Sequence, residues 1–91
     1  MFEIIPFKEC RTQIRIGLAL RQSGQVQESA SAFYRAIQLD PSYALTYANL
    51  GAALLEGNNL KQSREYLARA IVIDPKLGMA HYNLGFNSVA F

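Results

Sequence analysis

The chain has 91 residues, of which 51% are hydrophobic and 18% charged, and its formal net charge is +2 at pH 7. This balance excludes an intrinsically disordered protein, and no apolar run approaches the ~20 residues that a membrane-spanning helix needs. The single cysteine, Cys10, excludes an internal disulfide and any cysteine-based metal cluster.

The chain opens with a short apolar segment over residues 1–9, which contains Phe2 and Ile4. An early acid and a proline interrupt this segment, and it lacks a basic region followed by a long apolar one. We therefore expect residues 1–9 to be an N-terminal apolar extension rather than a secretory signal, and we expect a cytoplasmic protein.

Residues 10–43 and 44–77 match each other when Cys10 is aligned with Ala44. The identical pairs are Thr12/Thr46, Gly17/Gly51, Ala19/Ala53, Leu20/Leu54, Ser29/Ser63, Arg35/Arg69, Ala36/Ala70, Ile37/Ile71, Asp40/Asp74 and Pro41/Pro75. Residues 78–91 begin a third copy, in which Asn83-Leu84-Gly85 repeats Asn49-Leu50-Gly51. The sequence therefore encodes two full units and the first part of a third.

Each full unit is predicted to contain two helices. Between Thr12 and Leu20 the local spacing does not distinguish a helix from a strand, but the second copy does. Its larger residues recur at spacings of three, four and seven, which is one stripe of a helix: Tyr47, Leu50, Gly51 and Leu54. The second half of each unit has a similar stripe, formed by Val26, Ala30, Phe33 and Ile37 and then by Leu60, Leu67 and Ile71.

Short polar segments divide these helices. Ser23-Gly24 and Gly57-Asn58-Asn59 separate the two helices of a unit, because glycine and asparagine tolerate the left-handed backbone at which helices end. Asp40-Pro41 and Asp74-Pro75 separate the units, because proline cannot continue the helical hydrogen-bond ladder and disfavours helix in the residue before it. The sequence therefore predicts about five helices.

Small residues recur at equivalent places in the units: Gly17, Gly51, Gly85, Ala36 and Ala70. We expect two helix axes to approach closely there, because a larger side chain would be overpacked by roughly 1–3 kcal/mol.

This pattern resembles the tetratricopeptide repeat (TPR) family, in which a bulky residue, Leu-Gly, spaced small and bulky residues and a proline follow in order. The second copy reads Tyr47-x-x-Leu50-Gly51-x-x-Leu54, then Ser63-x-x-x-Leu67-x-x-Ala70, then Pro75. The departures are Gln13 and His81 in the place of Tyr47, and Ser29 and Ser63 where the family usually has alanine. The resemblance covers residues 10–91 and implies an all-α fold, a right-handed α-solenoid of antiparallel helix pairs.

The resemblance also implies a protein-interaction module, because the first helix of each TPR pair lines a concave groove that binds a peptide or protein. The matching residues here are Arg11, Ile14, Leu18 and Arg21, then Leu45, Ala48, Asn49, Ala52, Leu55 and Glu56, and finally Met79, Tyr82, Asn83 and Phe86. Such a groove would be basic at one end and apolar at the other.

Asn49 and Asn83 occupy equivalent places in the units, and Arg15 takes this place in the first. The chain is similar here to TPR proteins in which successive asparagines run along the concave face, because an amide can both donate to and accept from a peptide backbone. The alternative is that asparagine before Leu-Gly is simply common in the repeat. TPR domains that grip the C-terminal carboxylate of chaperones use five polar residues, and only Asn49 agrees with them. The matching places hold Ile14, Leu18, Asn49, Met79 and Asn83, so such a grip is not expected.

Other classes of function have less support. The only histidine, His81, takes the place of Tyr47 one unit later, and no catalytic partner is evident for it. No phosphate-binding loop, zinc spacing or nucleophile motif occurs, so we expect no enzyme, catalytic residue, metal or cofactor. The positive charge near the first helix is interpreted as a solvated face: Lys8, Arg11, Arg15 and Arg21. With a net charge of only +2 we expect neither nucleic acid nor a membrane as partner.

Both ends of the sequence are apolar, whereas repeat arrays usually finish with a polar outer face. Three explanations remain open: a fragment of a longer array, an N-terminal segment that folds back along the groove, or two copies that cover the ends by dimerisation or helix exchange. We favour self-association for the isolated chain, through Phe2, Ile4, Phe86, Val89 and Phe91. A homo-oligomerisation module is thus the alternative to a peptide-binding module.

Overall fold

The structure is a computed structural model that describes the backbone of residues 4–90 and the side chains of residues 8–85. Its helices are α1 (Ile4–Gln22), α2 (Val26–Leu39), α3 (Ala44–Glu56), α4 (Leu60–Ile73) and α5 (Gly78–Ala90). The prediction of an all-α chain of about five helices is confirmed, and the described residues contain no strand. Within these residues, none of the helices is both long and apolar enough to cross a membrane.

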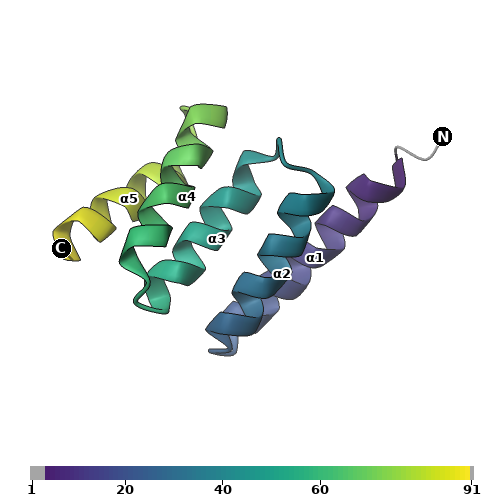
Figure 1. The fold of residues 1–91 in the computed structure, drawn as a ribbon, viewed down its shortest axis with the longest axis horizontal. Coiled ribbons are helices and arrows are strands. Elements are labelled where there is room, and N and C mark those ends of the chain that lie inside the picture. The colour runs from purple at the N-terminus through teal and green to yellow at the C-terminus, as the bar shows by residue number, and fades with distance from the viewer. Residues whose placement is uncertain (1–3, 91) are drawn as a thin grey trace.

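The helices follow one another along a body that measures 45 × 29 × 17 Å, with α1 at one end and α5 at the other (Figure 1). Each helix packs against the next, and α3 also contacts both α1 and α5. The first helices of the three units, α1, α3 and α5, therefore form one layer, which α2 and α4 cover on one side. This layer positions the candidate binding surface.

The apolar core consists of two clusters that share α3. One cluster joins α1, α2 and α3 around Phe33 and Leu50, and the other joins α3, α4 and α5 around Leu67. Because four helices surround α3, nearly all of its residues are buried, from Ala44 to Leu54 with the exception of Leu45. The predicted single stripe on this helix was therefore too narrow.

Left-handed residues end the first helix of each full unit, as the sequence predicted. Gly24 has φ +86° and Asn58 has φ +65°, and these residues occupy equivalent places in the two units. Gly57 has φ −81°, so the asparagine rather than the glycine makes the turn after α3. The next backbone N–H then bonds back into the helix, from Gln25 to Leu20 O and from Asn59 to Leu54 O, both at 2.8 Å.

The Asp-Pro segments lie between the units, as predicted. A side chain of the helix that follows contacts the proline carbonyl oxygen of each segment. Tyr47 Oη donates to the carbonyl oxygen of Pro41 at 2.8 Å. His81, one unit later, places Nε2 at 2.7 Å from the carbonyl oxygen of Pro75. The histidine thus keeps the contact that tyrosine makes in the unit before, and this structural role accounts for the substitution.

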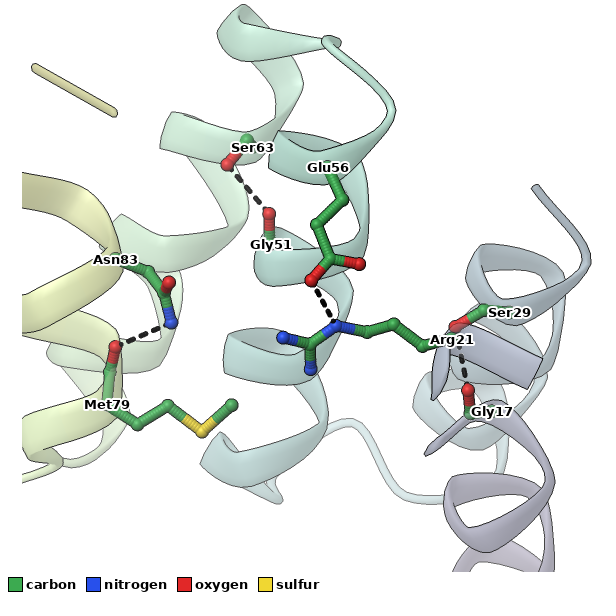
Figure 2. Close-up of polar contacts among 8 residues, drawn as sticks. All are labelled: Gly17, Arg21, Ser29, Gly51, Glu56, Ser63, Met79 and Asn83. Atoms are coloured by element: carbon green, nitrogen blue, oxygen red, sulfur yellow. Dashed lines mark hydrogen bonds and ion pairs between the residues drawn. The ribbon is translucent and has the colours of Figure 1, made fainter. Parts of the chain in front are cut away.

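The glycine contacts are confirmed for two of the three positions. A Cβ atom at Gly17 would lie 2.6 Å from a ring carbon of Phe33, and one at Gly51 would lie 2.5 Å from Cγ of Leu67. The second helix of each unit also donates a serine hydroxyl to the glycine carbonyl, from Ser29 to Gly17 at 2.8 Å and from Ser63 to Gly51 at 2.7 Å (Figure 2). At Gly85 no heavy atom of the described residues lies within 4 Å of such a Cβ.

Tyrosines fill the junction between the two full units. The ring of Tyr66 lies edge-on to Tyr34 at 5.9 Å and stacks on Tyr47 at 6.2 Å, measured between centroids. The guanidinium of Arg69 lies 5.3 Å from the centre of the Tyr66 ring. Such aromatic pairs add about 0.5–1.5 kcal/mol each beyond the burial of their surface, so they fasten one unit to the next.

The N-terminal boundary differs from the prediction. Helix α1 begins at Ile4, so most of residues 1–9 extend the first helix rather than preceding it as a separate extension. Phe2 lies outside the described residues.

Candidate partner-binding surface

The candidate surface is the side of the α1–α3–α5 layer that α2 and α4 do not cover. We call it the inner surface. Two hollows lie along it. One, of about 210 Å³, is lined by Leu18, Arg21, Gln22 and Glu56 and lies between α1 and α3. The other, of about 290 Å³, lies between α3 and α5, and its lining residues are Ala52, Leu55, Glu56, Asn58, Leu60, Tyr82 and Asn83. Glu56 lines both hollows, so they are neighbours on one surface.

An ion pair crosses the inner surface between the first two units. Arg21 Nε on α1 donates to Glu56 Oε2 on α3 at 2.9 Å (Figure 2). Both side chains are partly exposed, and such surface pairs contribute about 0–1 kcal/mol. The pair therefore does more to orient the Arg21 guanidinium than to stabilise the fold.

The two asparagines occupy equivalent places in their units, but only Asn83 lines a hollow of the inner surface. Asn83 Nδ2 donates to the carbonyl oxygen of Met79 at 2.9 Å, a contact within α5 that leaves the Asn83 side-chain oxygen without a protein donor among the described residues (Figure 2). Asn49 is only 3% exposed, and none of the hydrogen bonds of the described residues involves its side chain. Asn83, with a spare side-chain oxygen beside a hollow, can therefore bind a peptide backbone, whereas Asn49 has groups unpaired within the described residues but almost no exposed surface.

Burial divides the other residues that were predicted to line the groove. Ile14 is 6% exposed and belongs to the first core cluster, and Ala48 is 0% exposed in the second. These two predictions were wrong for a rigid surface, because neighbouring helices already cover both side chains. Arg11 and Tyr82 are exposed, the latter by 75%, whereas the remaining predicted residues are partly buried or line a hollow: Leu45, Ala52, Leu55 and Met79. The side chain of Phe86 lies outside the described residues.

The α1 end of the inner surface is basic. A shallow hollow of about 220 Å³ is lined by Lys8, Arg11, Thr12 and Arg15. Arg11 and Arg15 are the equivalents, one unit earlier, of Leu45 and Asn49. The first unit therefore has two cations at the positions where the second unit has an apolar residue and an amide.

An apolar pocket on the other side of the layer was not foreseen from the sequence. It has a volume of about 290 Å³ and is lined by Tyr47, Ala68, Arg69, Val72 and Ile73. Val72 is 81% exposed, so this lining residue presents apolar surface to solvent. The available signal was Ala68, because the equivalent residue in the first unit is the large Tyr34.

The single cysteine has structural surroundings. Cys10 is buried, and its thiol donates to the carbonyl oxygen of Ala36 at 3.4 Å. Burial, with a smaller effect of the Asp40 charge, raises the pKa of the Cys10 thiol, so it stays protonated and is a poor nucleophile at neutral pH. Within the described residues no group of three His, Cys, Asp or Glu side chains could hold a metal ion.

Comparison with known proteins gives consistent results. A family model described as "TPR repeat" matches residues 17–57, and one described as "Tetratricopeptide repeat" matches residues 44–77. A search of curated protein sequences found no match. Among solved structures, the Arabidopsis OM64 TPR domain superposes with a TM-score of 0.91 at 24% identity, over 93% of this chain and 70% of that one. The second TPR of Spaghetti (RPAP3), bound to the HSP90 peptide SRMEEVD, has a TM-score of 0.86 at 20% identity, over 89% of this chain and 75% of that one.

Proposed function

Because this chain belongs to the tetratricopeptide repeat family, a family of protein-interaction modules, we propose that it binds a peptide or protein segment on its inner surface. The observation that carries this proposal is the pair of hollows that meet at Glu56, with Asn83 on the rim of the second. Together the two hollows present apolar side chains, amide groups and charged groups along the first helices of the three units. The proposal includes no catalytic activity and no cofactor.

The similar Spaghetti domain was solved with a bound peptide, which supports this class of partner for the same fold. The mode of binding proposed here is different. Met79 and Ile14 stand in two places where a chaperone-type carboxylate grip needs cations, and Ile14 is in the core. We therefore propose contacts to the backbone of an extended segment, made by Asn49 and Asn83.

Replacing both Asn49 and Asn83 with alanine should weaken peptide binding at least about tenfold, because each amide lost removes hydrogen bonds of about 0.5–1.5 kcal/mol each. Peptides would be selected from a random display library against the native protein, and their affinities measured by calorimetry. The matched control is the double variant Gln27→Ala, Gln38→Ala, which removes two exposed amides from α2. Equal binding by the asparagine variant and the control would reject the role of the amides.

A second candidate function is self-association, and the surroundings of Gly85 favour it. Phe33 and Leu67 would meet a Cβ atom at the equivalent glycines, but no described residue lies within 4 Å of such an atom at Gly85, and Val72 and Ile73 are exposed on α4, the helix that packs against α5. A helix that packs on α5 and α4 would cover both places. We propose that a second copy supplies this cover when the chain is isolated.

Light scattering across a concentration series should then give a mass that rises from monomer to a defined dimer. The triple variant Phe86→Ser, Val89→Ser, Phe91→Ser should remain monomeric, because it lowers the apolar surface available to a second copy. Tyr82→Ser is the control, since Tyr82 is assigned to the peptide surface and should leave the mass unchanged. A native chain that is monomeric at every concentration would exclude this candidate.

A further inference from the structure

We propose that the segment bound on the inner surface is acidic where it crosses α1 and uncharged where it crosses α5. This inference rests on the proposed function and adds the chemistry and the register of the partner.

The α1 end of the surface carries three cations that have no ion-pair partner among the described side chains. Lys8, Arg11 and Arg15 follow one another at spacings of three and four residues, which puts them on one face of the helix. All three are exposed and line one hollow, and no ion pair joins them to a carboxylate within the described residues. Their mutual repulsion is unfavourable, and carboxylates of a partner would relieve it.

The nearest acid of the same helix does not neutralise this face. Glu9 precedes by one turn Gln13, whose side-chain oxygen accepts from Arg35 Nε on α2 at 3.0 Å. Residues one turn apart share a side of the helix. Glu9 therefore follows the side of α1 that faces α2, away from the hollow of the three cations.

The charge changes systematically from α1 to α5. Between α1 and α3 the next cation, Arg21, already binds Glu56 at 2.9 Å, so it offers less to a partner. Helix α5 contains no Asp, Glu, Lys or Arg anywhere in its sequence, Gly78–Ala90. A partner segment therefore meets free positive charge, then a neutralised pair, then an uncharged surface.

The repeat sets the spacing that the partner must match. Arg15, Asn49 and Asn83 are equivalent residues on successive first helices. Packed helices are about 8–10 Å apart, and an extended chain advances about 3.3 Å per residue. The acidic residues should therefore lie about three positions from the residue at Asn49 and about six from the residue at Asn83.

Peptides of designed sequence test this inference. Each fluorescent probe has about ten residues, the length that crosses three first helices in extended form. One set carries a block of glutamates at either end and uncharged residues elsewhere, a second set disperses the same glutamates, and a third replaces them with lysine. We expect the best glutamate-block peptide to bind about tenfold tighter than its lysine counterpart at low salt, and to lose that advantage as salt is raised.

Two double variants locate the effect. Arg11→Gln, Arg15→Gln and the control Lys61→Gln, Lys76→Gln remove the same charge, and all four side chains are exposed. The first should weaken the glutamate-block peptide by roughly two- to thirtyfold, and the control should change its affinity by less than about twofold, since exposed ion pairs contribute about 0.2–1 kcal/mol each. Binding of the neutral portion to Asn49 and Asn83 should persist in both.

Three outcomes would overturn the inference: no binding by any glutamate peptide, equal binding by the lysine peptides, or equal losses in the two double variants. A single-stranded oligonucleotide is measured in parallel, and tighter binding of it through Arg11 and Arg15 would also overturn the inference, by assigning the basic hollow to nucleic acid. The proposed function fails separately, since it requires only that some library peptide depends on Asn49 and Asn83.

Discussion

Replacing Gly51 with leucine should destroy the cooperative thermal unfolding of this chain. Even a methyl group there would lie 2.5 Å from Leu67 Cγ and 3.3 Å from the backbone oxygen of Ser63, so α3 and α4 would have to separate. Overpacking by a few atoms costs about 1–3 kcal/mol, and leucine adds more than that. A chain of this length has a free energy of unfolding of about 5–14 kcal/mol, so most of its stability is at risk.

Far-ultraviolet circular dichroism during heating would measure the effect, with each kcal/mol expected to lower the melting temperature by about 4–8 °C. Gly51→Ala should show a smaller loss in the same direction, and Leu67→Ala should partly restore that variant because it vacates the space. Gly85→Ala is the matched control. The added methyl group meets no described residue and gains up to about 1 kcal/mol of helix propensity, so the melting temperature of this variant should stay the same or rise. Equal losses at Gly51 and Gly85 would contradict the assignment of the close contact.

Phe33→Ala should lower the free energy of unfolding by about 3–5 kcal/mol, the usual range for removing a buried aromatic ring from a core. The ring is fully buried, contacts Gly17 from α2 and belongs to the cluster that joins α1, α2 and α3. Its loss would open a cavity where three helices meet. Urea unfolding, followed by circular dichroism, gives this free energy directly.

The repeat supplies an internal reference for this second prediction. Leu67 performs the same task over Gly51, so Phe33→Leu should cost less than about 1.5 kcal/mol, although Phe33→Ala is severe. Val72→Ala, at an exposed site, should change stability by less than about 0.5 kcal/mol. A small effect of Phe33→Ala would mean that the neighbouring helices close the cavity, and that the first unit is more plastic than its packing indicates.

The regular part of the fold could be predicted because it depends on features that repeat. Gly24 and Asn58 could be identified as turn residues because each follows an apolar helix and tolerates a positive φ, which both adopt. Gly17 and Gly51 could be identified as contact points because the same small residue recurs at the same offset in two units. A fixed repeat period constrains backbone geometry and packing together.

Features that depend on the number of neighbours could not be predicted in the same way. Sequence spacing assigns one apolar stripe to α3, but four surrounding helices bury it on almost every side. The same spacing treats Gly85 as equivalent to Gly51, although no described residue covers it. The spacing of apolar residues predicts which face of a helix can pack. The number of helices that pack on it is known only from the structure.

The candidate surface was predicted unevenly for the same reason. Tyr82 and Asn83 line the second hollow, and Arg21 with Glu56 lines the first. Ile14 and Ala48 lie on the predicted helices, but their side chains are buried in the core. Neighbouring positions on a helix differ in direction by only a fraction of a turn, so the sequence did not separate these two residues from exposed ones. The pairing of Arg21 with Glu56 joins residues 35 positions apart, and no local pattern signals it.

The tyrosine junction gives the chain an optical property of its own. The sequence has five tyrosines and no tryptophan, and Tyr34, Tyr47 and Tyr66 meet where the first unit joins the second. Near-ultraviolet signals of this protein therefore arise largely from one internal seam. Peptide circular dichroism in the far ultraviolet reports the helices themselves. Helix formation within the units and packing between the units can thus be followed separately by circular dichroism, without any added label.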